Sequence, residues 1–503
     1  MNAPLTRSPL SSLESLCLGS RYGRLPGAFH TRLPPSPLPS PHLVAFSEEA
    51  AALIGLDPQE ATRPEFVEVF AGNRLLAGAE PLAAVYGGHQ FGSWSGRLGD
   101  GRAHLLGDID TPQGRLDLQL KGAGPTPYSR FADGRAVLRS SLREFLCSEA
   151  MAALGVPTTR ALCVIGSPLP VQREQTETAA VLTRIAPSFV RFGTFEYFAD
   201  KEDVASLRTL ADHVIDQFRP QLRDTVRPFE SLLADVAQRT GELIAHWQAV
   251  GFMHGVMNTD NMSILGLTLD YGPFAFMDAF DAGRICNHSD TYGRYAFRAQ
   301  PRIANWNLYV LADALGPLIG HPDLTRTLVD AAFQPAFDAQ FSLLMRRRLG
   351  LVQAHPGDED FVGATLGLLQ LQRVDYTNFF RTLCELPGTV EREQRAVRDA
   401  ALRDLFADRE ACDAWLIGWR ARLAREGSVD ARRQPAMRAA NPRYVLRNWM
   451  AESAIRRARE GDFGEVHALL DCLRRPFDER PEHARFAAPP PDWASALTVS
   501  CSS

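Results

Sequence analysis

Short segments of alternating apolar and polar residues fill the chain between about residue 46 and residue 195. Runs at 103–108, 115–121 and 179–184 have the two-residue period of half-buried β-strands, and turns that contain glycine separate them. One longer segment, 136–154, repeats its apolar residues at helical spacing instead. The pattern predicts a small β-sheet accompanied by one helix.

Beyond about residue 205 the apolar residues follow helical spacing almost everywhere. The segments 231–250, 303–314, 324–349 and 360–386 each predict a helix with an apolar face. The end of the chain, which includes 441–449, is also predicted to be helical and is rich in arginine.

Four regions follow from these patterns. Residues 1–45 are rich in proline and serine and predict an extended arm. We expect a β-rich lobe over 46–200, a helical lobe over 201–400, and a helical C-terminal extension over 401–503. The predicted fold class is therefore α+β, with a cleft where the two lobes meet.

Composition excludes several classes of partner. The chain has 503 residues, 22% of them charged, and a formal net charge of −5, which gives no electrostatic reason to expect nucleic acid or an anionic membrane. No apolar run approaches the ~18–20 residues that span a bilayer, and the N-terminus lacks the pattern of a secretory signal. We therefore expect a cytoplasmic protein, and we expect it to be a monomer.

The eight cysteines are scattered and form no C-x-x-C pair, which argues against a structural zinc site and a disulfide-rich scaffold. Cys501 stands apart because it is third from the end of the chain. A thiol on a free tail is either inert or a mobile redox group.

Lysine is rare in this chain: of 54 basic residues only Lys121 and Lys201 are lysines, which leaves 52 arginines. Lys121 closes the alternating run 115–121. A lysine ammonium is a compact charge that fits between phosphate oxygens while it still pairs with a carboxylate. One interpretation of Lys121 is therefore a phosphate-binding residue; the other is an exposed lysine retained by chance, which is our interpretation of Lys201.

Two features near Lys121 are weak signals when taken alone. Gly99 and Gly101 belong to a glycine cluster that could let backbone N–H groups approach phosphates, although glycine turns between strands are common. Glu144 lies on the helix after Lys121 and could turn inward to pair with it, as in protein kinases. The alternative is a solvated glutamate beside Arg143.

The most specific motif is H-G-V-M-N-T-D-N at 254–261, followed by D-Y-G at 270–272. Kinase-like phosphotransferases have an aspartate two residues after the histidine, and it accepts the proton of the acceptor hydroxyl. Val256 occupies that position here and cannot accept a proton.

The metal-ligand types of that motif are present nevertheless. Asn261 offers an amide oxygen and Asp270 a carboxylate, while Asp260 supplies an acid at a shifted position. An ordinary turn and a core histidine are the alternative interpretation. The order of lysine, glutamate, H-x-x-x-x-x-x-N and D-Y-G favours a nucleotide and metal site.

Arg184 and Arg191 lie near the predicted lobe junction, and arginine binds phosphates through two parallel hydrogen bonds. A triphosphate held by this pair could lie reversed, with its γ-phosphate drawn inward and its α-phosphate presented to the acceptor. In a chain so rich in arginine, the alternative is an ordinary arginine surface.

Beyond these motifs the chain closely resembles the selenoprotein O family of kinase-like protein adenylyltransferases over nearly its whole length. The resemblance rests on long and unusual strings at 86–92, 99–102, 120–130, 133–135, 254–261, 270–272 and 441–449. It implies a protein-kinase-like bilobal fold, with a β-rich N-lobe carrying one key helix and a helical C-lobe.

The resemblance also implies an activity. Members bind ATP in a flipped orientation and transfer AMP to Ser, Thr or Tyr hydroxyls of other proteins with Mg²⁺ or Mn²⁺, and transfer of UMP from UTP is also associated with the family. It implies that Glu144 pairs with Lys121, that Asn261 and Asp270 bind the metal, and that Asp260 accepts the proton. The nucleotide contacts it implies are Gly99, Gly101, Arg102, Lys121, Asp133, Gly134, Arg184, Arg191 and Asp270.

Family members carry selenocysteine or cysteine near the C-terminus, where this chain has Cys501, and some form a disulfide from it. Cys286 is the matching partner that the resemblance implies, so activity is expected to depend on reduction. Two other functions stay open: a kinase-like phosphotransferase with Asp260 as a displaced base, and a nucleotide-binding protein without turnover that its thiols control.

Overall fold

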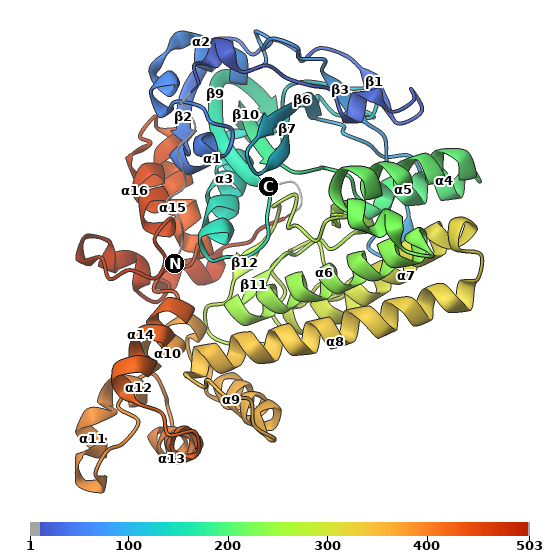
Figure 1. The fold of residues 1–503 in the computed structure, drawn as a ribbon. Coiled ribbons are helices and arrows are strands. Elements are labelled where there is room, and N and C mark those ends of the chain that lie inside the picture. Colours follow the sequence, from blue (N-terminus) through green and yellow to red (C-terminus); the bar gives the residue numbers. More distant parts are fainter. Residues whose placement is uncertain (1–10, 501–503) are drawn as a thin grey trace.

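An antiparallel sheet forms the N-terminal part of the molecule, and helices form most of the rest (Figure 1). The structure, a computed structural model, describes residues 11–500 apart from the side chain of Pro322. The strand order along the sheet is β1-β3-β6-β7-β10-β9-β2, and β8 pairs with β10. These strands are β1 His30–Arg32, β2 His42–Phe46, β3 Leu82–Ala84, β6 Ala103–Thr111, β7 Gly114–Lys121, β8 Ala136–Val137, β9 Arg160–Gln172 and β10 Thr176–Ala186. Two separate pairs are β4 His89–Gln90 with β5 Ser93–Trp94, and β11 Phe252–Met253 with β12 Ala275–Phe276.

The helices fall into an N-terminal set that packs on the sheet and a larger set that follows it. The first set is α1 Glu48–Leu53, α2 Pro64–Phe70 and α3 Leu138–Ala153. The second set is α4 Phe192–Asp200, α5 Val204–Phe218, α6 Pro228–Val250, α7 Gln300–Ile319, α8 Pro322–Leu349, α9 Asp358–Gln372, α10 Tyr376–Leu383, α11 Arg395–Arg398, α12 Ala400–Arg403, α13 Arg409–Arg425, α14 Asp430–Ala440, α15 Asn448–Arg459 and α16 Gly464–Leu473. The predicted division into a β-rich part with one principal helix and a helical part is confirmed.

Two helix predictions are wrong in detail. The segment 360–386 is not one helix, because Arg373 adopts a left-handed conformation that ends α9 and the Asp375 carboxylate then caps α10. Residues 441–447 are not helical, because Pro442 cannot continue a helix and disfavours helical geometry at the residue before it. Helix α15 begins only at Asn448.

The predicted N-terminal arm is partly built into the sheet. Strand β1 pairs with β3 at one edge, and β2 pairs with β9 at the other. The prolines between β1 and β2 lack N–H donors, which suits a connection that runs between the two edges without pairing. The arm therefore supplies both edge strands of the sheet, and its leucines Leu13, Leu16, Leu18 and Leu38 pack in an apolar cluster with residues of the strands.

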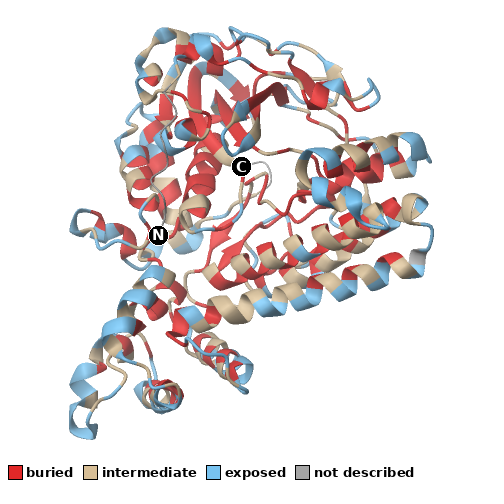
Figure 2. Ribbon diagram, in the orientation of Figure 1, coloured by how far each residue is buried: buried red, intermediate tan, exposed pale blue. Residues whose placement is uncertain are grey.

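One continuous core joins the sheet to the helical part. Buried side chains of the sheet, α3, α6, α7, α15 and α16 belong to a single apolar cluster, and Figure 2 shows the strands and α3 as largely buried. Helix α3 packs on β9 and β10 from the side opposite α1 and α2, because α3 is buried with one set of alternating strand residues and α1 and α2 with the other. None of the helices in residues 11–500 combines the length and apolarity needed to cross a bilayer.

Candidate functional site

A cavity of about 670 Å³ brings together residues of the sheet and of the loops after α6. It contains every residue that the sequence predicted to contact nucleotide or metal or to accept a proton. These are Gly99, Gly101, Arg102, Lys121, Asp133, Gly134, Arg184, Arg191, Asp260, Asn261 and Asp270. Glu144 and Cys286 are not among the lining residues.

The sheet register places three polar side chains on one face near the cavity. Lys121, the last residue of β7, lies opposite Leu182 of β10, and Gln119 lies opposite Arg184. Because side chains alternate along a strand, Lys121, Gln119 and Arg184 project to the same side. Arg184 Nη1 donates to Gln119 Oε1 over 3.2 Å.

Glu144 of α3 receives two of these cations. Its Oε2 lies 2.6 Å from Lys121 Nζ, and its Oε1 lies 2.5 Å from Arg184 Nε. Glu144 is buried, as is its neighbour Arg143, which donates to the Phe274 carbonyl instead of facing solvent. Arg184 and Lys121 hold the pKa of the Glu144 carboxyl below its usual value in spite of burial, so it is an anion.

Asp270 is the carboxylate on which the site's buried cations converge. Arg184 Nη2 lies 2.5 Å from Oδ1, Lys121 Nζ lies 3.6 Å from the same oxygen, and Arg191 donates to Oδ2. Although burial opposes ionisation, Arg184, Arg191 and Lys121 lower the pKa of Asp270 well below its ordinary value. Asp270 also has a positive φ of 56°, a strained conformation for a residue other than glycine.

Burial disfavours the charged form of Lys121 as well. Desolvation, with Arg184 close by, lowers the pKa of Lys121 to about 8. The ammonium therefore binds its proton less tightly than an exposed lysine, and an added phosphate anion would favour the charged form.

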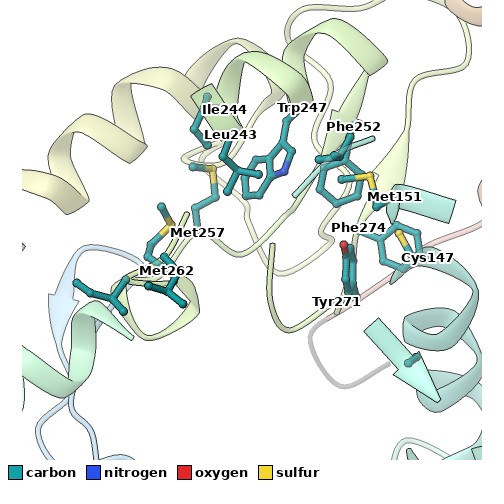
Figure 3. Close-up of a cluster of buried hydrophobic side chains, with 14 of the residues drawn as sticks. Cys147, Met151, Leu243, Ile244, Trp247, Phe252, Met257, Met262, Tyr271 and Phe274 are labelled. Atoms are coloured by element: carbon teal, nitrogen blue, oxygen red, sulfur yellow. The ribbon is translucent and has the colours of Figure 1, made fainter. Parts of the chain in front are cut away.

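The loop that carries Asp270 packs on an apolar cluster. Figure 3 shows Trp247, Phe252 and Tyr271 in this cluster, and the His254 ring stacks on Trp247 with centroids 5.3 Å apart. The Val256 N–H donates to His254 Nδ1, so the Nε2–H group donates to the Leu269 carbonyl over 2.8 Å. His254 is thus a buried residue that holds the backbone at Leu269, the residue before Asp270.

The oxygen donors of the site suit a hard divalent cation. Asn261 Nδ2 donates to the Val256 carbonyl over 3.0 Å, and no residue in the described part of the chain donates to its Oδ1. Asp270 supplies an ionised carboxylate. Among residues 11–500 no group of three or more His, Cys, Asp and Glu side chains could hold a metal ion. The pair fits Mg²⁺ or Mn²⁺ bound jointly with substrate phosphates, a common arrangement for Mg²⁺.

Asp260 is buried beside Asn261 and Asp270, and only one of its two carboxylate oxygens has a hydrogen-bond partner among the described residues. Gln90 Nε2 donates to its Oδ2 over 3.2 Å, whereas Oδ1 has no partner within the part of the chain that the structure describes. Burial raises the pKa of Asp260 to about 6. Val256, at the usual position of a kinase base, lines the same cavity.

Packing accounts for one residue of the glycine loop, Gly99. Gly99 has a φ of +130°, and a Cβ atom there would lie 2.5 Å from Cγ of Tyr128. The loop lies this close to Tyr128 only because residue 99 is glycine. Asp133, which precedes Gly134, forms an ion pair with Arg173 over 2.7 Å.

Some residues of the site were not predicted from the sequence. Tyr86 lies under the Arg191 guanidinium at 4.9 Å, Gln90 binds Asp260, and buried Asp100 accepts a hydrogen bond from the Ala84 N–H. Tyr86 and Gln90 belong to the string 86–92, which is one of those that carry the family resemblance. The spacing of that string alone assigned neither residue a role.

The cavity carries an excess of positive charge. Its lining includes six cations, Arg102, Lys121, Arg135, Arg173, Arg184 and Arg191, and four carboxylates, Asp100, Asp133, Asp260 and Asp270. Glu144, just behind the lining, brings the carboxylates to five. This balance favours an anionic ligand.

Comparison with known proteins agrees with this chemistry. Residues 13–474 match the family model described as "Protein adenylyltransferase SelO". The chain belongs to the SelO family. A SelO-family relative from Dechloromonas aromatica, "Protein nucleotidyltransferase YdiU", is 61% identical over 503 residues and covers 100% of both chains. A relative of the same name from Herminiimonas arsenicoxydans is 55% identical, and the match covers 100% of both chains. Another from Ralstonia nicotianae is 57% identical, and the match covers 96% of this chain and 95% of the relative.

The redox pair implied by the SelO resemblance is only partly described. Burial raises the pKa of the Cys286 thiol to about 12, so little thiolate forms at neutral pH. Its expected partner, Cys501, lies outside the described residues, and the pairing remains a prediction.

The described end of the tail nevertheless lies close to the segment of Cys286. The His288 N–H donates to the Val499 carbonyl over 2.8 Å. One residue further on, Ser500 Oγ donates to Glu174 Oε1 in the turn between β9 and β10 over 3.4 Å. The tail therefore contacts both the helical part and the sheet.

Replacing Asp260 by asparagine should stabilise the protein when nucleotide and metal are absent. A carboxyl whose pKa rises from 3.8 to about 6 on folding favours the folded state at low pH and opposes it once ionised. We expect Asp260→Asn to raise the free energy of unfolding by up to about 3 kcal/mol at pH 7.5, with the gain vanishing near pH 4. Denaturant unfolding of both proteins across this pH range measures the difference, and a pH-independent difference would contradict the assignment.

Proposed function

We propose that this chain is a protein adenylyltransferase with a protein-kinase-like bilobal fold. It transfers AMP or UMP from ATP or UTP to Ser, Thr or Tyr hydroxyls of other proteins and releases pyrophosphate. The observation that carries the proposal is the convergence of Lys121, Arg184 and Arg191 on Asp270 in a cavity where Val256 replaces the kinase base. The printed names of the family and of the relatives support nucleotidyl transfer.

The buried cations favour a reversed triphosphate. Arg184 and Arg191 are each 3% exposed, whereas Arg102 is exposed at the cavity wall. The terminal phosphate carries the most charge and gains most from the least hydrated cations. A γ-phosphate bound by Arg184, Arg191 and Lys121 leaves the α-phosphate to face the acceptor.

Phosphate binding also requires an exchange of partners at Asp270. In the structure both of its oxygens are held by arginines. A triphosphate that takes over the guanidinium groups would release the Asp270 carboxylate. Asn261 and Asp270 would then hold Mg²⁺ or Mn²⁺, which would supply charge neutralisation on the phosphates.

Asp260 is suited to move the proton of the acceptor. With a pKa of about 6 it is mostly ionised at neutral pH, and its Oδ1 is free to accept. The acceptor oxygen forms a bond to the α-phosphorus, the bond from that phosphorus to the β-phosphate oxygen breaks, and the hydroxyl proton goes to Asp260. Lys121 and the arginines stabilise the charge that develops on the departing pyrophosphate.

The label test separates this function from its alternatives. With ATP labelled at the α-phosphate, we expect radioactivity to enter acceptor protein, and with γ-labelled ATP we expect none. Protein labelled only from the γ-position would establish a phosphotransferase. Absence of label from either position would indicate a binding protein without turnover.

The chain's two lysines provide a matched pair for the same assay. Lys121→Met removes the ammonium that bridges Glu144 and Asp270, so we expect transfer to fall by roughly 10²-fold or more. Lys201→Met removes an exposed lysine that rests on the Tyr197 ring, and activity should be retained. Equal activity of the two variants would contradict the phosphate-binding role of Lys121.

We also propose that a Cys286–Cys501 disulfide restricts access to the site, since the tail contacts both parts of the molecule. Oxidised glutathione would take the two electrons as the thiols join. We expect wild type to lose transfer activity in oxidised glutathione and regain it in dithiothreitol, and Cys286→Ser to stay active in both. Cys17→Ser, which removes an exposed thiol, is the control and should behave as wild type. Peptide mapping that finds both thiols free after oxidation would contradict the pairing.

A further inference from the structure

A second cavity, of about 640 Å³, adjoins the candidate site across the β4–β5 hairpin. Adjacent residues of a strand face opposite ways, and the two residues of β4 follow that rule: His89 lines the second cavity, whereas Gln90 lines the first. The second cavity also receives residues of α4, α7 and α8, including Glu196, Trp306 and Arg326.

The hairpin is bonded to the loop that carries Asp260. The His89 N–H donates to Thr259 Oγ1 over 2.7 Å, and Gln90 Nε2 donates to Asp260 Oδ2 over 3.2 Å. The Phe91 N–H, in the turn of the hairpin, donates to Asn258 Oδ1 over 3.1 Å. A group bound in the second cavity would therefore contact a segment that is hydrogen-bonded to Asp260.

A buried carboxylate in this cavity has spare bonding capacity. The Glu196 side chain is 3% exposed, and its Oε2 pairs with His89 Nδ1 over 2.6 Å. Its Oε1 has no hydrogen-bond partner among the described residues. Because an unsatisfied buried acceptor costs free energy, a donor that reached this oxygen from the cavity would be stabilised there.

The rest of the wall suits a cation. Two further carboxylates, Asp200 and Asp313, line the cavity together with one guanidinium, that of Arg326, which is 59% exposed and lies 3.4 Å from Asp313. Negative side chains therefore outnumber positive ones, so the cavity attracts cations and disfavours phosphate or nucleic acid.

Aromatic rings complete the wall. The His89 ring lies between Trp94 and Trp306, with centroids 5.3 and 5.6 Å away, and Tyr309 lines the same cavity. Trp306 already accepts a guanidinium within the chain, because Arg294 lies 4.7 Å from its ring centroid. Indole rings next to carboxylates are favourable surroundings for a guanidinium or ammonium group.

We propose that the second cavity binds an arginine or lysine side chain of the acceptor protein and so selects hydroxyls that lie near a basic residue. The proposal rests on the proposed function, because it assumes that the acceptor is a protein. The exposed carboxylates at the cavity rim, Asp200 and Asp313, make it accessible to a side chain from another polypeptide. A bound basic residue would hold the acceptor segment against the hairpin, with its hydroxyl directed to Asp260.

Peptides test this selection. Each peptide carries one serine and one arginine at a varied distance from it, and its partner carries glutamine in place of arginine. At the best distance we expect wild type to favour the arginine peptide by about tenfold in kcat/KM and in binding affinity, the effect of one charge-assisted or cation–π contact. Glu196→Gln and Asp200→Asn should each reduce this preference to below about threefold.

Asp224→Asn, which alters an exposed aspartate of the linker between α5 and α6, is the matched control and should keep the full preference. Equal kcat/KM and equal affinity for both peptides at every distance would overturn the proposal, as would a preference that survives in both cavity variants. Binding of the peptides is measured by titration calorimetry without nucleotide. Failure of the proposed nucleotidyl transfer would therefore appear as absent labelling with the binding preference intact.

Discussion

Four charged side chains from separate elements meet around Asp270, and the organisation of the site depends on their balance. Lys121 comes from β7, Arg184 from β10 and Arg191 from the start of α4, while Glu144 of α3 receives Lys121 and Arg184 from the other side. Breaking a buried network of this kind by removing one partner typically costs about 3–5 kcal/mol, since it strands a charge. The network thereby ties the sheet, its principal helix and the D-Y-G loop into one arrangement.

The same network links folding to function. Asp270 keeps a strained backbone, and Asp260 nearby keeps a carboxyl whose ionised form burial penalises. Neither feature favours stability in the absence of a ligand. Both are explained if a polyanion and a metal ion complete the site, because these ligands would replace the contacts between arginine and Asp270 with contacts to phosphate.

The sequence predicts much of the fold and most of the residues that line the candidate site. The two-residue and helical periods predicted the sheet, α3 and the helical remainder, and motif order together with the family resemblance predicted which residues share the cavity. Periodicity could not show that Arg373 interrupts a helix, since that depends on one backbone angle and the Asp375 cap. Nor could it place Gln90 against Asp260, because that contact joins residues 170 positions apart. Long-range polar contacts leave little trace in local spacing.

The central claim is that the buried cations bind the far end of a reversed triphosphate. A crystal structure of the protein with Mg²⁺ and α,β-methylene ATP, which cannot release pyrophosphate, tests it directly. The account predicts the γ-phosphate against Lys121, Arg184 and Arg191, the α-phosphorus nearest to Asp260, and Asp270 on the metal. A γ-phosphate next to Asp260, with both arginines still bound to Asp270, would contradict it.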